Sequence, residues 1–244
     1  MSHVQQMKLI ELMASGLPQY FKSQRVLEIG SLDINGSIRR HFESCDYIGI
    51  DVAPGKGVDV VCQGQDFAEP DGSFDHVVSC EVMEHNPHWR STFANMVRLC
   101  RAGGLVVMTC ATIGRPEHGT TRTNPSKSPL TVELKWEYYK NLTEENFRSA
   151  VDLNAHFSDY YFAVNWSSFD LYFCGIKRSS TESISRDAWP NLTQRLDSYV
   201  FSENQRKICR YRRLAAKHLG DSWFTIWRKI GDMLNSRLIK YAHQ

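Results

Sequence analysis

The sequence predicts an α/β fold built on a doubly wound, mostly parallel sheet. An apolar run over 25–29 ends in a glycine turn, and a second apolar run over 47–50 ends in Asp51. Further apolar runs of strand length alternate with helical patterns, and the hydrophobic fraction of 42% suffices for one sizeable core. An acid at the end of the second strand is how such a sheet holds a nucleoside beyond its carboxyl edge.

The elements follow one another along the chain in the order that this fold requires. Apolar residues at helical spacing over 4–22 predict a helix that covers the ligand edge as a lid. Residues 160–177 read as two strands that close the sheet as an antiparallel hairpin. The remaining strands are expected at 25–30, 47–52, 58–62, 76–82 and 105–112, and the remaining helices at about 36–43, at 89–100 and after an N-cap at Thr143.

The first turn favours one kind of nucleoside. A dinucleotide site needs a glycine-rich turn against its pyrophosphate, but only Gly30 and Gly36 are present here, beside the acids Glu28 and Asp33. Carboxylates repel a phosphate and suit a ligand that carries a sulfonium and an ammonium group. We therefore expect S-adenosylmethionine (SAM), with its ribose hydroxyls on Asp51. An ordinary strand-turn-helix corner without ligand is the simpler alternative.

Four motifs in order make the chain similar to class I, methyltransferase type 11-like, SAM-dependent methyltransferases over about residues 24–178. They are the first motif at 28–36, the third strand and its turn at 58–64, the fourth strand at 71–85 and the fifth strand at 101–110. The resemblance implies a Rossmann-like, seven-stranded sheet and S-adenosylhomocysteine as product. It also implies a cofactor site that consists of Glu28, Gly30, Asp33, Asp51, Gln63, Gly64 and Cys80, the last through its backbone near the methionine. Gln63 stands where the family more often has Asp.

The chain is expected to divide into a methyltransferase domain, 1–179, and a basic helical extension, 180–244. Within the first part, the segment 113–141 is polar, rich in turns and too long for a simple connection. Its hydrogen-bonding side chains next to Tyr138 and Tyr139 favour a hydroxyl-rich acceptor. We predict O-methylation of a sugar or saccharide-linked small molecule, with a solvated flexible loop as the alternative interpretation of this segment.

A hydroxyl acceptor must lose a proton, and histidine, with a reference pKa near ~6.5, is a suitable base. The candidates are His118 in the insertion and His85 at the exit of the fourth strand, although His85 also resembles a structural cap of the following helix. Carboxylates and imidazoles at this exit could instead hold a divalent metal, as the set Glu81, Glu84, His85 and His88. Solvated helix-entry residues are commoner, so we predict no metal.

The extension is strongly basic. Between residues 204 and 240 there are ten Lys and Arg against two Asp, a net charge of +8, while the whole chain carries +2. This asymmetry predicts an anionic partner. An apolar stripe from Trp223 to Leu238 favours packing on its own domain or on a second subunit of a homo-oligomer, with contact to an anionic membrane surface as the second interpretation. Nucleic acid is the third and weakest.

Composition and missing motifs restrict the remaining classes. Seven cysteines without a metal-like pair and the lack of a long apolar run predict a cytoplasmic protein. An N-methyltransferase or a nucleic-acid methyltransferase stays open, although the Asn/Asp-Pro-Pro-Tyr sequence of DNA amino-methylating enzymes is absent. A non-catalytic SAM-binding scaffold that acts through its basic tail is the other class.

Overall fold

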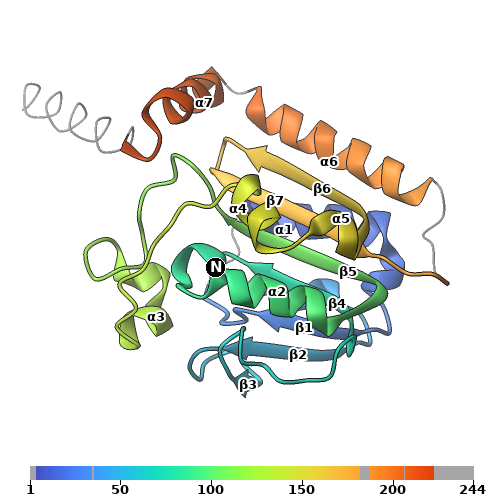
Figure 1. The fold of residues 1–244 in the computed structure, drawn as a ribbon. Helices are drawn as coiled ribbons and strands as arrows, with labels where there is room; N and C mark the ends of the chain where they lie inside the picture. The colour runs from blue at the N-terminus through green and yellow to red at the C-terminus, as the bar shows by residue number, and fades with distance from the viewer. Residues whose placement is uncertain (1–3, 35, 182–186, 206, 223–244) are drawn as a thin grey trace, which may run out of the picture.

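The computed structural model describes residues 4–34, 36–181, 187–205 and 207–222 (Figure 1). The strands are β1 (Arg25–Ile29), β2 (Asp46–Asp51), β3 (Val60–Val61), β4 (Phe74–Cys80), β5 (Cys100–Ala111), β6 (Phe157–Asn165) and β7 (Asp170–Lys177). They form a seven-stranded sheet in the order β3-β2-β1-β4-β5-β7-β6, in which β7 runs antiparallel to both of its neighbours. The predicted doubly wound, mostly parallel sheet is therefore confirmed.

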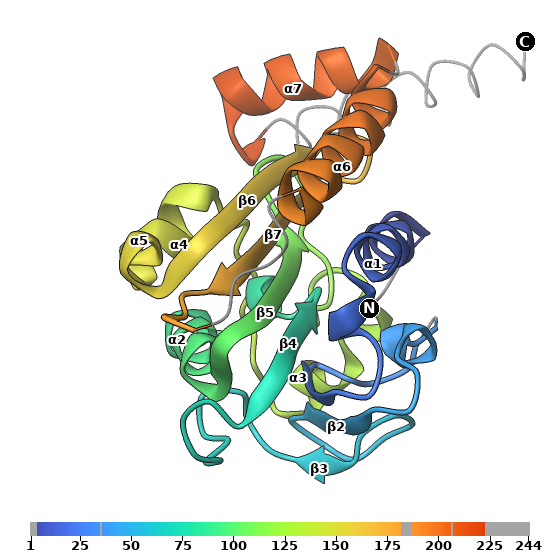
Figure 2. The same cartoon turned by 90° about the vertical axis from the view of Figure 1, so that its right-hand side faces the viewer.

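Helices cover both faces of this sheet (Figure 2). On one face, α1 (Val4–Gly16) and α6 (Ala188–Asn204) contribute apolar side chains to one core cluster with the sheet. On the other face, α2 (Trp89–Leu99), α4 (Glu144–Ala150) and α5 (Leu153–His156) enclose the second cluster. The central strands β1, β4 and β5 are therefore buried on both sides, as parallel strands in α/β folds usually are.

The predicted lid helix is wrong. Leu9, Ile10 and Met13 of α1 are buried in the core with Leu192 of α6, and the helix packs on a face of the sheet. Its apolar stripe is needed there because the chain between β1 and β2 forms only a short 3-10 helix, η2 (Ile38–His41), where a longer helix is expected.

The helix predicted to follow Thr143 is present in the structure. α4 begins directly after Thr143, as predicted, and the Asn146 side chain accepts a hydrogen bond from the Thr143 amide at 3.0 Å. The predicted strand over 58–62 shortens to the two residues of β3, and both of these valines are exposed at the sheet edge.

The segment 113–141 lies off one end of the sheet, at the left of Figure 1, and contains η4 (Pro125–Lys127) and α3 (Pro129–Glu133). The extension continues past β7 into α6 and then α7 (Lys207–Leu219). The apolar stripe predicted from Trp223 to Leu238 lies outside the described residues. Among the helices that the structure describes, none is both long and apolar enough to cross a membrane.

Candidate functional site

A cleft lies where β1, β2 and β4 end, and the insertion borders it. Gly30 follows β1, Asp51 ends β2, Gly64 follows β3 and His85 follows β4, and all four line the cleft. From the insertion, the lining includes Lys127, Ser128, Leu130, Thr131 and Trp136. The carboxyl edge of the sheet is thus the place where ligands of open α/β folds bind.

Asp51 is held in position by the backbone around it. Its carboxylate accepts hydrogen bonds from the amides of Leu32 at 3.1 Å and Val52 at 2.8 Å. Burial raises the pKa of Asp51, while these two hydrogen bonds oppose the shift. The two amides fix the orientation of the carboxylate toward the cleft, and its remaining lone pairs can still accept hydrogen bonds from a ligand.

Gly30 is required by the turn that follows β1. Its φ is +83°, in the left-handed region, and a Cβ atom there would lie 2.0 Å from Cγ2 of Val82. Any side chain would therefore strain the backbone and collide with Val82, two residues after β4. The bare backbone of Gly30 borders the cleft and leaves room for a ligand at close approach.

Four of the predicted cofactor residues do not line the cleft, and two of these are acids. Glu28 is buried and accepts a hydrogen bond from the Tyr47 hydroxyl at 2.8 Å, and burial raises its pKa to about 7. Asp33 accepts from the Gly36 amide at 2.8 Å and pairs with Lys56 at 2.7 Å. Both acids thus stabilise the first turn and its surroundings from outside the cleft.

The other two are Gln63 and Cys80. The Gln63 side chain accepts a hydrogen bond from the side chain of Gln65 at 2.8 Å, and it is Gln65 that lines the cleft. Cys80 is buried at the end of β4, and burial raises the pKa of its thiol to about 12. A period-two strand pattern places such residues near the edge but does not decide which side chain faces the ligand.

The two predicted catalytic histidines lie side by side. His85 belongs to the short helix η3 (Met83–His85), and its ring centroid is 4.9 Å from that of His118 in the insertion. Tyr139 packs on both rings, at 5.5 Å from His85 and 5.0 Å from His118. Gly119, with φ +69°, brings the insertion so close that a Cβ there would lie 2.7 Å from Cε1 of His85.

Burial favours the neutral form of both imidazoles. Burial, followed by the neighbouring His118, lowers the pKa of His85 to about 3. Burial and the charge of Arg115 lower the pKa of His118. His118 Nδ1 lies 2.9 Å from the carbonyl oxygen of Pro116, which can only accept, so this nitrogen carries the proton and Nε2 keeps its lone pair.

Glu84 lies next to this pair in an unusual state. Its side chain is fully buried, and neither carboxylate oxygen has a hydrogen-bond partner among the described residues. Burial and then the charge of Glu81 raise the pKa of Glu84 well above its ordinary value. One ligand-type atom from each of Glu84, His85 and His118 lies within 4.8 Å of the other two, whereas His88 is exposed and faces Trp136.

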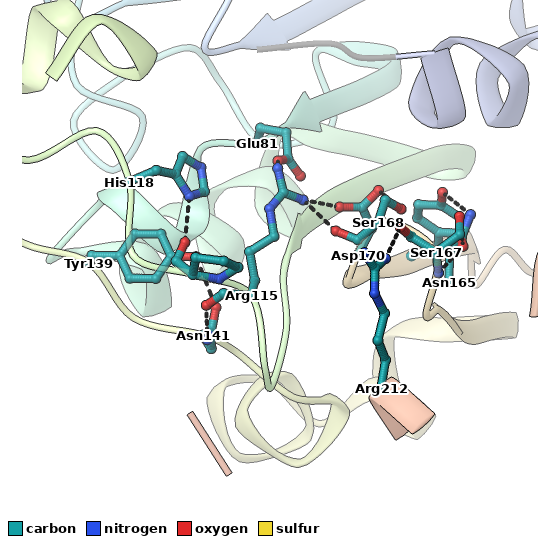
Figure 3. A network of polar contacts seen from close by, with 12 residues as sticks. Glu81, Arg115, His118, Tyr139, Asn141, Asn165, Ser167, Ser168, Asp170 and Arg212 are labelled. Atoms are coloured by element: carbon teal, nitrogen blue, oxygen red, sulfur yellow. Dashed lines mark hydrogen bonds and ion pairs between the residues drawn. The ribbon is translucent and has the colours of Figure 1, made fainter. Parts of the chain in front are cut away.

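An ion-paired arginine anchors the insertion beneath the cleft (Figure 3). Arg115 pairs with Glu81 at 2.8 Å and with Asp170, and it donates to the carbonyl oxygen of Ser168 at 3.1 Å. Glu81 adopts a left-handed backbone conformation, with φ 57°, to reach it. The sequence analysis missed Asp170, because only the pairing of β5 with β7 reveals that it lies opposite Ala111.

Several polar side chains of the insertion are occupied with one another. Arg122 pairs with Glu117 at 2.8 Å and with Glu137 at 3.1 Å, and Thr120 donates to Glu117 at 2.8 Å. These interactions hold the segment in shape. Lys127, Ser128 and Thr131 line the cleft, and the hydroxyl oxygens of Ser128 and Thr131 are hydrogen-bonded to each other at 2.6 Å. The aromatic residue that lines the cleft is Trp136, which the sequence analysis did not single out.

Comparisons with known proteins agree with this architecture. Residues 27–108 match the family model of a methyltransferase domain. No curated protein matches the chain. Among solved structures, it is similar to the 1,6-didemethyltoxoflavin-N1-methyltransferase of Burkholderia thailandensis, with 12% identity, a TM-score of 0.50 and coverage of 72% of this chain and 79% of that one. It is also similar to the N-methyltransferase NodS of Bradyrhizobium japonicum WM9, with 15% identity, a TM-score of 0.45 and coverage of 73% and 90%. At these identities the first likeness shows the fold alone.

Proposed function

Because residues 27–108 match a methyltransferase-domain model, we propose that the chain is a class I, SAM-dependent methyltransferase that methylates a hydroxyl group of a sugar or saccharide-linked small molecule. The observation that carries the proposal is the contact of His118 with His85, which lines the cleft, together with an unpartnered ring nitrogen on His85 and the lone pair on Nε2 of His118. An amine or thiol acceptor would demand less help, whereas a hydroxyl must be activated before it attacks a sulfonium methyl group.

In this proposal SAM occupies the cleft along the ends of β1 and β2. Asp51 accepts hydrogen bonds from the ribose hydroxyls, and the backbone of Gly30 lies against the methionine part. Gly64, after β3, borders the adenine. Glu28, Asp33, Gln63 and Cys80 support these positions, since their side chains bond within the protein or are buried away from the cleft.

The acceptor is placed between the insertion and the histidine pair. Ser128, Thr131 and Lys127 offer hydrogen-bond donors and acceptors, and Trp136 offers an aromatic face. Polar groups around an aromatic platform suit the hydroxyls and the C–H face of a saccharide. The product is the methyl ether, and neutral S-adenosylhomocysteine leaves.

His118 and His85 activate the hydroxyl in this proposal. Each can do so directly, as a base, or indirectly, as the ligand of a cation that acidifies the hydroxyl. In both cases the imidazole must be neutral, and burial favours this for both rings.

The test is methyl transfer from SAM to a panel of saccharides by the His118→Ala variant. We expect turnover to fall by about a hundredfold or more with SAM affinity unchanged. His85→Ala tests the partner ring. His156→Ala is the matched control, because this exposed histidine ends α5 and does not line the cleft. Normal turnover in both cleft variants would contradict the proposal.

A further inference from the structure

We propose that Glu84, His85 and His118 bind a divalent transition-metal cation beside the cofactor cleft. Glu84 and His85 belong to η3, and His118 belongs to the insertion, 33 residues further along the chain than His85. One donor atom from each residue lies within 4.8 Å of the other two. Ligand atoms on a tetrahedral cation are roughly 3.4 Å apart. A small inward rotation of these side chains would therefore complete the set.

The first argument is the state of Glu84. A carboxyl group that is removed from water is normally hydrogen-bonded or paired, because burying it alone costs free energy. Glu84 is fully buried, yet both of its oxygens have no hydrogen-bond partner among the described residues. Nδ1 of His85 is buried and unpartnered in the same way. A cation between the two residues would satisfy all of these atoms at once.

The second argument is that the surrounding backbone holds this cluster together. Lys140 donates its amide to the carbonyl oxygen of Glu84 at 2.9 Å, which ties η3 to the end of the insertion. Gly119 allows the other end of the insertion to approach His85 as closely as it does. The contact between Pro116 and His118 leaves Nε2, the usual ligand atom, with its lone pair.

The local charges permit a cation. Arg115 acts electrostatically on all three residues, but it is already paired with Glu81 and Asp170. Glu81 keeps its other oxygen, Oε1, buried and without a hydrogen bond, close to the cluster. Two imidazoles and one carboxylate are typical ligands of Zn²⁺, Co²⁺ or Mn²⁺, whereas Mg²⁺ prefers oxygen donors alone.

Three protein ligands leave an open position, as in catalytic metal sites. His85 lines the cleft, so an acceptor bound in the cleft would lie next to the ligand set. Resting on the proposed function, an acceptor hydroxyl that binds there would lose its proton to solvent more readily. Its oxygen would then form the new C–O bond as the C–S bond breaks, and the electron pair of that bond would remain on sulfur.

The test uses the full chain, freed of metal with a chelator and then titrated with Co²⁺ under visible absorption. We expect one Co²⁺ per chain and at least ~10-fold weaker binding in Glu84→Gln and in His118→Ala. His88→Ala should bind as the unmodified chain does. Calorimetry with SAM shows that each variant is folded. No saturable uptake of Co²⁺, or equal uptake by the unmodified chain and both ligand variants, would overturn the metal site.

Activity separates this inference from the proposed function. If the cation acts in the reaction, chelated enzyme should lose methyl transfer to a saccharide and regain it with Zn²⁺ or Co²⁺. Unchanged transfer by metal-free enzyme would overturn the role of the cation and leave the O-methyltransferase standing. Saturable Co²⁺ binding without transfer to any hydroxyl acceptor would support the metal site and overturn the proposed function.

Discussion

Single residues at the cleft divide into those that face it and those that hold it in shape. Asp51 and Glu28 are both acids at the ligand edge of the sheet, yet Asp51 lines the cleft and Glu28 is bonded to Tyr47. The sequence placed both near the cofactor because each belongs to a strand that leads to this edge. Which of the two acids faces the ligand depends on side-chain packing, which the strand pattern does not contain.

Replacing Asp51 tests the proposed cofactor site. Asp51→Ala should weaken SAM binding at least tenfold, since hydrogen bonds to a charged group are each worth roughly 1.5–3 kcal/mol. Calorimetric titration with SAM measures the change. Asp51→Asn is the matched variant, because its remaining oxygen can still accept from Leu32 or Val52 and preserve the turn. Unchanged affinity in both folded variants would remove Asp51 from the proposed site.

Among the secondary-structure elements, apolar runs correctly predicted where the strands lie, whereas turn residues did not predict where a strand begins. The predicted strand over 105–112 begins at Cys100 in the structure, because Phe74 pairs with Cys100 while His76 pairs with Leu105. The glycine turn at 103–104 is thus absorbed as an irregularity within β5. Local patterns could not reveal this, because it depends on pairing with another strand.

The histidine pair shows the same limit. Both residues were predictable as cleft candidates, because His85 follows a strand and His118 lies in the long insertion. Their contact with Glu84 was not predictable, since it depends on how the insertion folds back over η3. The exposed position of His88 was hidden for the same reason, because spacing along a strand exit does not determine exposure.

β4 carries a pH-dependent contribution to stability. His76 is fully buried beside the stacked rings of Phe21 and Phe42, and burial lowers its pKa to about 4. The unfolded chain, with a histidine pKa near ~6.5, binds the proton that the folded chain refuses, so stability falls as the pH drops from 6.5 to 4. The loss should reach about 3 kcal/mol below pH 4, of which about 2 kcal/mol falls between pH 7 and pH 5. Urea unfolding of the protein and of His76→Asn at pH 5 and pH 7 measures it.

Glu28 is the control with the opposite sign. Burial raises its pKa to about 7 from an unfolded value near ~4.5, so the folded chain binds the extra proton between these values. Its contribution is present at low pH and is lost as the pH rises toward 7. Glu28→Gln should therefore remove a contribution to the free energy of unfolding that decreases as the pH rises. His76→Asn should remove one that increases as the pH rises. Identical curves for the protein and His76→Asn would contradict the assignment to His76.

At the scale of the whole molecule, the extension is joined to the site. Asp221, just after α7, accepts hydrogen bonds from the Gly114 amide at 3.0 Å and from Asn141 at 2.7 Å. Asn141 in turn donates to the carbonyl oxygen of Arg115 at 2.8 Å, and Arg212 of α7 donates to that of Ser167 at 2.6 Å (Figure 3). The extension therefore supports the base of the insertion, and a truncation must leave Asp221 in place.

The segment 223–244 should serve assembly or docking and take no part in methyl transfer. Its apolar stripe, from Trp223 to Leu238, contains no acid–base group, and an amphipathic helix of that length needs a partner surface to be stable in water. Deleting 223–244 should therefore leave SAM affinity unchanged. It should reduce the number of subunits in the oligomer or abolish sedimentation with anionic liposomes.

Salt distinguishes the two kinds of partner. Attraction between the basic residues of the extension and an anionic lipid surface should fade as the Debye length falls from ~10 Å at 0.1 M toward ~3 Å at 1 M, whereas a buried apolar interface between two chains should persist. Exposed Tyr211 and Leu214 among the arginines of α7 remain after the deletion, so Arg210→Glu and Arg213→Glu test whether this helix adds to lipid binding. If the truncated chain keeps its oligomeric state and its liposome binding but no longer binds SAM, the segment belongs to the cofactor site.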